Sequence, residues 1–283
     1  MTDLTIYPFN NIPRFKSPIF IIGAFESFHI GHHQLYEKAK ELKQNNEHDI
    51  VLIYFKDVEN LPKNINKFIF SNLQARLQIF ANLNFEYAIE LEYSKVKNYL
   101  AEEFINILTE NNKDFKIIIG KDFHFGYQGQ GNYEFLEQKF PNQIYSIDIL
   151  KLQNSAKISS SFIKESLELG DIELVNTLLV MPYSFNANLD LEHNLSFKEN
   201  LVMLPNGIYA STMQYNDYEY KCALLVKDQK YKIQILDFKY KNKDIQNVNI
   251  IVEKNIRFFA DGEKQVIKKD DFIKIKKYYL DIK

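Results

Sequence analysis

Two histidines flank a glycine near the start of the chain, at a spacing that suits phosphate chemistry. His29 and His32 lie on either side of Gly31, shortly after an apolar run. Each imidazole can donate a hydrogen bond to a phosphate oxygen, and each can change its charge near neutral pH. Gly31 has no Cβ, so backbone and phosphate can approach closely. The pattern predicts nucleotide phosphate binding, whereas a lone histidine would more simply be a half-buried structural side chain.

A strand and a helix must position these histidines. Residues 19–22 are four consecutive apolar residues, and Gly23 ends the run. Beyond His32, Leu35 and Ala39 recur at helical spacing among charged residues, which predicts an amphipathic helix. A helix that begins after a strand directs its first N–H groups and its positive dipole end toward the turn, where they attract anions.

A second, glycine-rich cluster follows another short apolar strand. Four of the nine glycines lie within residues 120–131. This density predicts a loop shaped for close approach to a ligand, with Asp122 and His124 as polar contacts. The alternative is an ordinary surface loop in which Phe123 and Phe125 belong to the core.

Serines flanked by lysines form a third cluster. Ser160 and Ser161 stand at a predicted helix start, and Lys157 and Lys164 lie about one helical turn to either side. Serines at a helix start are ordinary N-caps. The two lysines make a second phosphate clamp the competing interpretation.

The elements around these clusters alternate between strand and helix up to about residue 182. Strands that are apolar on both faces and alternate with helices predict a parallel sheet covered on both sides. Ligands bind such sheets beyond the carboxyl ends of the strands, where Gly23 and Gly120 lie. After Pro182 the pattern becomes mainly antiparallel, with a helical tail near residues 271–279. Further strands are expected near 208–215, 219–226, 231–238 and 248–252.

We therefore expect an α/β protein with two domains. Residues 1–182 would form a Rossmann-like nucleotidyltransferase domain, and residues 183–283 a smaller, mainly antiparallel β-barrel domain.

The composition is that of an ordinary globular protein. Apolar residues make up 46% and charged residues 25%, with a net charge of −2 and no basic block. Long nucleic acids and anionic membranes are therefore not expected as partners. The single cysteine, Cys222, excludes an internal disulfide framework and a cysteine-rich zinc site. The first residues do not resemble a signal peptide, so we expect a cytoplasmic protein.

Together the three clusters resemble the adenylyltransferase module of prokaryotic bifunctional riboflavin kinase/FAD synthetases. The family's G-x-F-D-G-x-H-x-G-H motif is matched by Gly23, Phe25, His29, Gly31 and His32. Its G-x-[DN]-F-x-F-G motif is matched in full by Gly120, Asp122, Phe123, Phe125 and Gly126. Its I-S-S-T-x-I-R motif is matched by Ile158, Ser159, Ser160 and Ile163. The resemblance covers roughly residues 1–185 with the motifs in the family's order.

The chain departs from these motifs at four positions. Glu26 and Ser27 replace the D-G of the first motif, so the turn there must differ slightly. Ser161 replaces threonine and Lys164 replaces arginine in the third motif. Lys164 keeps the positive charge but lacks the bidentate fork of arginine, which weakens a phosphate contact.

The resemblance implies transfer of AMP from ATP to the 5′-phosphate of FMN, giving FAD and pyrophosphate. It assigns the ATP phosphates to the helix N-terminus with His29, His32 and the residues around them, Gly23, Phe25 and Gly31. It assigns the β/γ end of ATP to Lys157, Ser160, Ser161 and Lys164. The catalytic residues are expected to be His29, His32 and Lys164. It assigns the flavin nucleotide to Asp122, Phe125, Gly126 and Asn132. Mg²⁺ is expected to arrive with the triphosphate, without a protein metal site of its own.

The C-terminal half resembles the family's riboflavin kinase module only in part. Residues 204–210 look like its P-x-x-G-V-Y-A strand entry, and residues 235–238 like its I-L-D-F strand. Its glycine-rich segment has no counterpart, since no glycine occurs between Gly170 and Gly207. Lys232 stands where the family has a glutamate, and lysine cannot accept a proton from a substrate hydroxyl at neutral pH unless its pKa is strongly lowered. We therefore predict that riboflavin kinase activity has been lost.

Three other interpretations stay open. The chain could be a fully bifunctional riboflavin kinase/FAD synthetase. It could be a non-catalytic flavin- or nucleotide-binding regulatory protein. His29-Ile30-Gly31-His32 also resembles a motif of class I aminoacyl-tRNA synthetases, but Ser160 occupies the second lysine position of their K-M-S-K-S motif and there is no basic, tRNA-sized appendage.

Overall fold

The computed structural model describes residues 3–43, 47–152, 156–236, 244–260 and 262–281. The chain divides into two compact units. The first contains Met1–Phe68 and Arg76–Ser159, and the second contains Ile69–Ala75 and Ser160–Lys283. The longer segment of the second unit therefore begins at Ser160. The domain boundary near residue 182 stays a prediction from the sequence.

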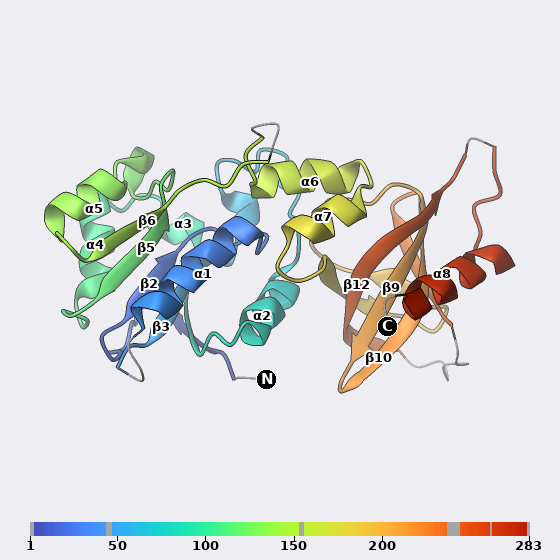
Figure 1. Ribbon diagram of the computed structural model, residues 1–283, viewed down its shortest axis with the longest axis horizontal. Coiled ribbons are helices and arrows are strands. Elements are labelled where there is room, and N and C mark those ends of the chain that lie inside the picture. Colours follow the sequence, from blue (N-terminus) through green and yellow to red (C-terminus); the bar gives the residue numbers. More distant parts are fainter. Residues whose placement is uncertain (1–2, 44–46, 153–155, 237–243, 261, 282–283) are drawn as a thin grey trace. The chain divides into compact units, whose positions relative to one another are not determined.

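The first unit is built on a six-stranded parallel sheet with the order β1-β4-β3-β2-β5-β6 (Figure 1). The strands are β1 (Thr5–Pro8), β2 (Ile19–Ile22), β3 (Ile50–Phe55), β4 (Tyr87–Leu91), β5 (Lys116–Gly120) and β6 (Ile144–Ile147). All of their pairings run parallel. The chain proceeds from β2 to β3 on one side and later places β5 on the other side of β2. The carboxyl ends of β2 and β5 therefore form a topological switch point, where open α/β sheets bind ligands.

Helices connect these strands. They are α1 (Ile30–Leu42), α3 (Tyr93–Val96), α4 (Ala101–Thr109) and α5 (Tyr133–Lys139), with the short turns η1 (Val58–Asn60) and η2 (Tyr127–Gly129). Helix α2 (Leu73–Asn82) crosses the division between the units.

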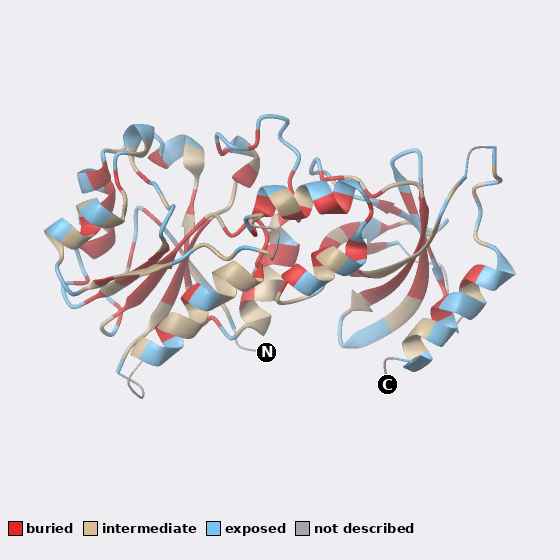
Figure 2. Ribbon diagram, turned by 45° about the horizontal axis from the view of Figure 1, so that its top comes forward, coloured by how far each residue is buried: buried red, intermediate tan, exposed pale blue. Residues whose placement is uncertain are grey.

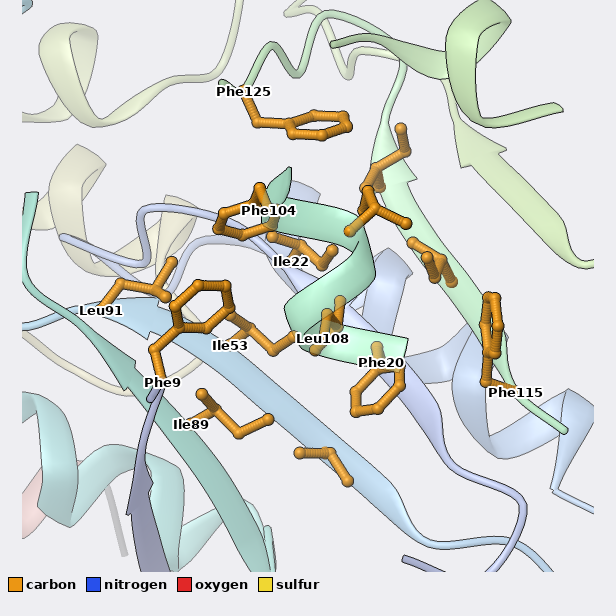
Figure 3. Packing of buried hydrophobic residues seen from close by; sticks show 14 of the residues in the cluster. Phe9, Phe20, Ile22, Ile53, Ile89, Leu91, Phe104, Leu108, Phe115 and Phe125 are labelled. Carbon is orange, nitrogen blue, oxygen red and sulfur yellow. The ribbon is translucent and has the colours of Figure 1, made fainter. Parts of the chain in front are cut away.

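All four residues of β2 are buried. Because successive residues of a strand point to opposite faces, both faces of the sheet are covered at β2. On one face, Phe104 and Leu108 of α4 belong to a hydrophobic cluster with Phe20 and Ile53 of the strands (Figure 3). On α1, Leu35 and Ala39 are the buried residues. This arrangement confirms the prediction of a parallel sheet covered on both sides.

The second unit contains a closed barrel with the strand order β10-β11-β8-β7-β12-β9. Its strands are β7 (Ser184–Leu189), β8 (Asn194–Ser196), β9 (Gly207–Tyr215), β10 (Tyr218–Lys227), β11 (Lys230–Ile235) and β12 (Ile245–Phe258). All of the barrel pairings are antiparallel. Helices α6 (Ser160–Glu168), α7 (Ile172–Leu178) and α8 (Lys269–Asp281) belong to the same unit. The buried residues coloured red in Figure 2 follow the strands of each unit.

The structure differs from the sequence prediction mainly at the barrel. Strands β7 and β8 were not predicted, nor was β1 in the first unit. Strand β12 extends beyond the predicted 248–252 at both ends, and three register shifts in its pairings interrupt the alternation that would have revealed its full length. Strand β11 ends at Ile235, and residues 237 and 238 of the I-L-D-F segment lie outside the described residues. At the C-terminus, α8 confirms the helical tail.

Candidate active site

The turn from β2 to α1 carries the two histidines. The Gly23 N–H donates to the Ile53 carbonyl at 3.1 Å, which extends the pairing with β3 beyond the end of β2. Phe25 has a φ of 48°, and its ring is fully buried. That ring lies 4.7 Å from the His32 imidazole, measured between ring centroids. Phe25 therefore supports His32 from within the core, which gives this motif position a packing role.

His29 is the N-cap of α1. Its Nδ1 accepts the N–H groups of Gly31 at 3.1 Å and His32 at 3.3 Å. Because Nδ1 must supply a lone pair to both donors, the neutral ring carries its proton on Nε2. A Cβ on Gly31 would stand 3.0 Å from the His29 ring, so glycine at this position makes room for the cap.

This capping revises the expectation that the helix N-terminus offers free N–H groups. The Gly31 and His32 N–H groups are already engaged by His29. The donor available from this arrangement is instead the Nε2–H of His29.

His32 is held by a carbonyl group. Its Nδ1 lies 2.7 Å from the Ser27 oxygen, and a carbonyl can only accept a hydrogen bond, so Nδ1 carries the proton. The neutral ring then has its lone pair on Nε2. The rings of His29 and His32 stack with centroids 3.8 Å apart and planes 16° from parallel. The pair thus offers one ring-nitrogen donor from His29 and one ring-nitrogen acceptor from His32.

Both imidazoles are neutral at physiological pH. Burial lowers the pKa of His29 to about 4, and the positive charges of Lys63 and Lys157 add to this effect. Burial also lowers the pKa of His32 well below its ordinary value, and the neighbouring His29 lowers it further. Positive charge at the site therefore comes from the lysines rather than from the imidazoles.

Asp122 and Lys157 form an ion pair beside the histidines. Both side chains are about half-exposed, and both influence the pKa of His29 through their charges. Asp122 follows β5 and His29 follows β2, so the switch point brings together residues of the first two sequence clusters, and Lys157 adds a residue of the third. The structure thus gathers His29, His32, Asp122 and Lys157 within the first unit.

The remaining predicted flavin contacts have structural roles in the loop after β5. Phe125 is buried in the hydrophobic cluster with Phe104 (Figure 3). Gly126 has a φ of 75°, and a Cβ there would lie 2.7 Å from the Ala101 backbone nitrogen. Asn132 is the N-cap of α5, with its side chain accepting a backbone N–H at 2.9 Å. Their contact with flavin stays a prediction.

Of the third motif, Ile158 and Ser159 belong to the first unit, and the residues from Ser160 onward form the start of α6 in the second unit. Ser160 is buried, Ser161 is exposed and Lys164 is partly buried. The phosphate contacts expected of these residues stay predictions.

A family model described as FAD synthetase matches residues 13–162, more than half of the 283-residue chain. The chain belongs to the FAD synthetase family. All the residues gathered at the switch point lie inside the matched region.

Two curated relatives extend the match beyond this module. The bifunctional riboflavin kinase/FMN adenylyltransferase of Buchnera aphidicola subsp. Acyrthosiphon pisum is 25% identical over 235 residues, covering 76% of this chain and 74% of the relative. A protein of the same description from Mycoplasma pneumoniae is 26% identical over 213 residues, covering 71% of this chain and 72% of the relative. The resemblance to the bifunctional family inferred from the motifs is thereby confirmed.

A solved structure shows the same fold along the whole chain. It is described as a macrolide-efflux protein from Streptococcus pneumoniae and aligns with 100% of this chain and 98% of its own. The TM-score is 0.77 and the identity is 18%, so the likeness is one of fold.

Sequence reasoning did not single out Lys63, whose ammonium group lies 3.7 Å from the Glu26 carboxylate. Lys63 lies in the segment after β3, and its charge lowers the pKa of both histidines. The strand-end rule that singled out Gly23 and Gly120 would also have drawn attention to the segment after residues 50–55.

The described residues contain no group of three or more histidine, cysteine, aspartate or glutamate side chains that could hold a metal ion. Within the same part of the chain, no helix is both long and apolar enough to cross a membrane.

Proposed function

We propose that this chain is a single-function FAD synthetase, which transfers AMP from ATP to FMN and no longer phosphorylates riboflavin. One oxygen of the FMN phosphate forms a bond to the α-phosphorus of ATP, and the bond from that phosphorus to the bridging oxygen of pyrophosphate breaks. FAD and pyrophosphate are the products. The attacking phosphate is already an anion, so the reaction needs positioning and charge stabilisation more than a strong base.

The observation that carries the adenylyl-transfer proposal is the stacked histidine pair. The Nε2–H of His29 is a preorganised donor, because two backbone N–H groups hold the opposite ring nitrogen. A neutral donor fixed in a partly buried site stabilises charge developing on a phosphate without having to reorient. His32 keeps the His29 ring in place by stacking on it.

Charged residues would complete the proposed site. Lys157 is proposed to contact the triphosphate when ATP displaces its partner Asp122, which would then be available to the flavin nucleotide. Ser160, Ser161 and Lys164 are proposed as contacts to the β/γ end, as the family motif implies. Phe125, Gly126 and Asn132 are proposed to shape the flavin-side loop. Mg²⁺ would enter as part of the ATP complex and neutralise phosphate charge there.

The loss of kinase activity is supported by two positions of the family's E-x-H-I-L-D-F motif, where this chain has Lys232 in place of the glutamate and Gln234 in place of the histidine. Lys232 and Gln234 lie on β11, and both side chains are exposed. The residues between and around them, Tyr231, Ile233 and Ile235, are buried. Buried apolar and exposed polar side chains therefore alternate along β11. The position where the family has a proton-accepting glutamate carries an exposed lysine.

The deciding experiment supplies the purified chain with ATP and Mg²⁺, together with riboflavin in one reaction and FMN in another, and separates the flavins by chromatography. We expect FAD from FMN and no product from riboflavin. FMN or FAD formed from riboflavin would show a fully bifunctional enzyme, as the names of the curated relatives describe for those proteins. No product in either reaction would favour the non-catalytic binding protein.

A further inference from the structure

We propose that Lys63 is a third cationic contact to the triphosphate of bound ATP, and that the buried carboxylate of Glu26 holds it in position. This inference rests on the proposed adenylyl transfer and extends its site by two residues. It starts from Glu26, one of the positions at which the chain departs from the family motif.

Glu26 is a fully buried carboxylate in the turn between β2 and α1. An isolated buried charge is costly, so a carboxylate persists there only when positive or hydrogen-bonding groups surround it. One such group is the guanidinium of buried Arg76. The charge of Glu26 raises the pKa of Arg76, partly opposing the larger lowering by burial.

Arg76 is fixed in place by backbone carbonyls. It donates to the carbonyl oxygens of Phe55 and Lys56, each at 2.8 Å, at the end of β3. A weaker contact reaches the Phe25 carbonyl at 3.4 Å. The carboxyl end of β3 and the turn that carries Glu26 are therefore tied together, and Arg76 supplies compensating charge to Glu26.

Glu26 in turn positions the segment that carries Lys63. The side-chain amide of Asn64 donates to the Glu26 Oε2 at 3.2 Å and to the Val58 carbonyl at 2.6 Å. Asn64 is itself buried. These two bonds close the chain from Val58 to Asn64 into a compact loop held against the β2–α1 turn.

Lys63 occupies the outer side of this loop. Its Nζ lies 3.7 Å from the Glu26 Oε2, beyond hydrogen-bond distance but within the range of an ion pair. The lysine side chain is 43% exposed, whereas the Glu26 side chain is fully buried. The Lys63 side chain therefore contacts a buried carboxylate and is also partly exposed to solvent.

The contacts of Lys63 and Asn64 with Glu26 hold this segment against the turn that also carries His29. The positive charge of Lys63 lowers the pKa of both His29 and His32. A cation with that influence on a site of neutral imidazoles adds the positive charge that the imidazoles do not provide. Several lysines suit the triphosphate of ATP better than the phosphate of FMN, because the triphosphate carries more negative charge.

The test compares Lys63→Met with Lys67→Met, a matched change of an exposed lysine four residues further along the same segment. Initial rates of FAD formation are measured against ATP at saturating FMN and against FMN at saturating ATP, and ATP binding is measured by titration calorimetry. We expect Lys63→Met to weaken ATP binding and lower kcat/KM for ATP about ten- to hundredfold, the size of a lost charge-assisted hydrogen bond. Lys67→Met should stay within about twofold of the wild type, and Lys63→Arg should recover much of the loss. ATP parameters within twofold of the wild type for Lys63→Met, or an effect confined to the KM of FMN, would overturn the proposal.

The positioning role of Glu26 has its own readout. Glu26→Gln removes the charge and should raise the KM for ATP with a smaller effect on kcat. Because the carboxylate acts through Lys63, adding Glu26→Gln to Lys63→Met should change ATP binding no further. Fully additive effects of the two substitutions on ATP affinity would contradict this coupling. Calorimetry with ATP separates the proposed contact of Lys63 from the proposed FAD synthesis. A wild-type chain that binds ATP without forming FAD would refute the proposed function, and the effect of Lys63→Met on ATP affinity could still be measured.

Discussion

At the scale of single residues, His29 uses its two ring nitrogens for different purposes. Nδ1 completes the hydrogen bonding of the first turn of α1, and Nε2 keeps the proton that the proposed chemistry needs. Asparagine can replace the first function, because its side-chain oxygen also caps helices, but it cannot reproduce the position of Nε2.

Two substitutions separate these functions. His29→Asn should keep the stability of α1 and lower the rate of FAD formation at least about 100-fold, as expected for loss of a preorganised donor. His29→Ala should lose activity to a similar degree and in addition cost about 1 kcal/mol of folding free energy through the lost cap. Chromatographic FAD assays and urea unfolding measure the two effects. A His29→Asn rate within threefold of the wild type would remove His29 from the mechanism.

The neutral state of His29 also predicts a pH dependence of stability. Burial, with the charges of Lys63 and Lys157, lowers the pKa of this ring from 6.5 to about 4. The unfolded chain therefore binds more protons than the folded chain between these values, and stability falls as the pH drops from 6.5 toward 4. The His29 share of this loss is about 3 kcal/mol. Urea unfolding across this pH range should show a shallower dependence for His29→Asn, and equal slopes in the two proteins would contradict the assignment.

The spacing of His29, Gly31 and His32 predicted that the two rings lie together where a helix begins, but not which ring nitrogen carries the proton. The tautomers depend on the Gly31 amide and the Ser27 carbonyl, which the folded turn brings to the rings. Lys63 was missed for a related reason, since its position depends on the buried Glu26 and not on a spacing within the chain.

At the scale of elements, the loop after β5 approaches the first residue of α4 closely at Gly126. Gly126 combines a φ of 75° with an approach that would leave a Cβ 2.7 Å from the Ala101 nitrogen. The glycine of this family motif therefore shapes the loop through packing, and any effect on ligand binding follows from that shape.

A pair of glycine substitutions tests this. Gly126→Ala faces both an unfavourable φ and a steric overlap with backbone, so we expect a loss of about 2–4 kcal/mol. Gly129→Ala is the matched control in the same loop, because Gly129 has a φ of 69° but a Cβ there would meet its nearest neighbour at an ordinary 3.4 Å. It should cost about 1 kcal/mol. Urea unfolding of both variants gives the comparison, and equal losses would show that the contact with α4 is not important.

Strands β2 and β3 were predictable because each is a short, continuous apolar run, whereas β1 was not predicted because its sequence, Thr5–Pro8, lacks such a run. The barrel strands were harder to predict. In β12 the register shifts after Val252 and again after Asn255, and each shift breaks the alternation that marks a half-buried strand. Strand β8 has three residues, too few for any periodicity to appear.

At the scale of the whole molecule, the two units have different sources of cohesion. The first is covered by helices on both faces of a parallel sheet, and the second is a closed barrel with no open sheet edge. Within the second unit, Arg257 anchors the start of α8. It donates to both carboxylate oxygens of Asp271, at 2.7 and 3.0 Å, and to Glu263 at 2.9 Å.

Arg257→Lys keeps the charge but loses the bidentate geometry. We expect this change to destabilise α8 on the barrel by about 1–3 kcal/mol, since Asp271 is buried and depends on that partner. Hydrogen exchange read by mass spectrometry should show faster exchange in peptides from α8 and unchanged exchange in peptides from α1. Slower or unchanged exchange throughout α8 would contradict the anchoring role.

The hydrogen bond from the Gly31 amide to His29 Nδ1 makes the NMR resonance of that amide sensitive to the state of the His29 ring. The proposed binding of a phosphate at Nε2 would shift the electron density of the whole ring, and the resonance of the Gly31 amide, which donates to Nδ1, would shift with it. The chain has nine glycines, so selective ¹⁵N-glycine labelling yields a spectrum simple enough to follow one resonance. Occupancy of the site can then be read from the backbone of a helix, without labelling the ligand and without waiting for turnover.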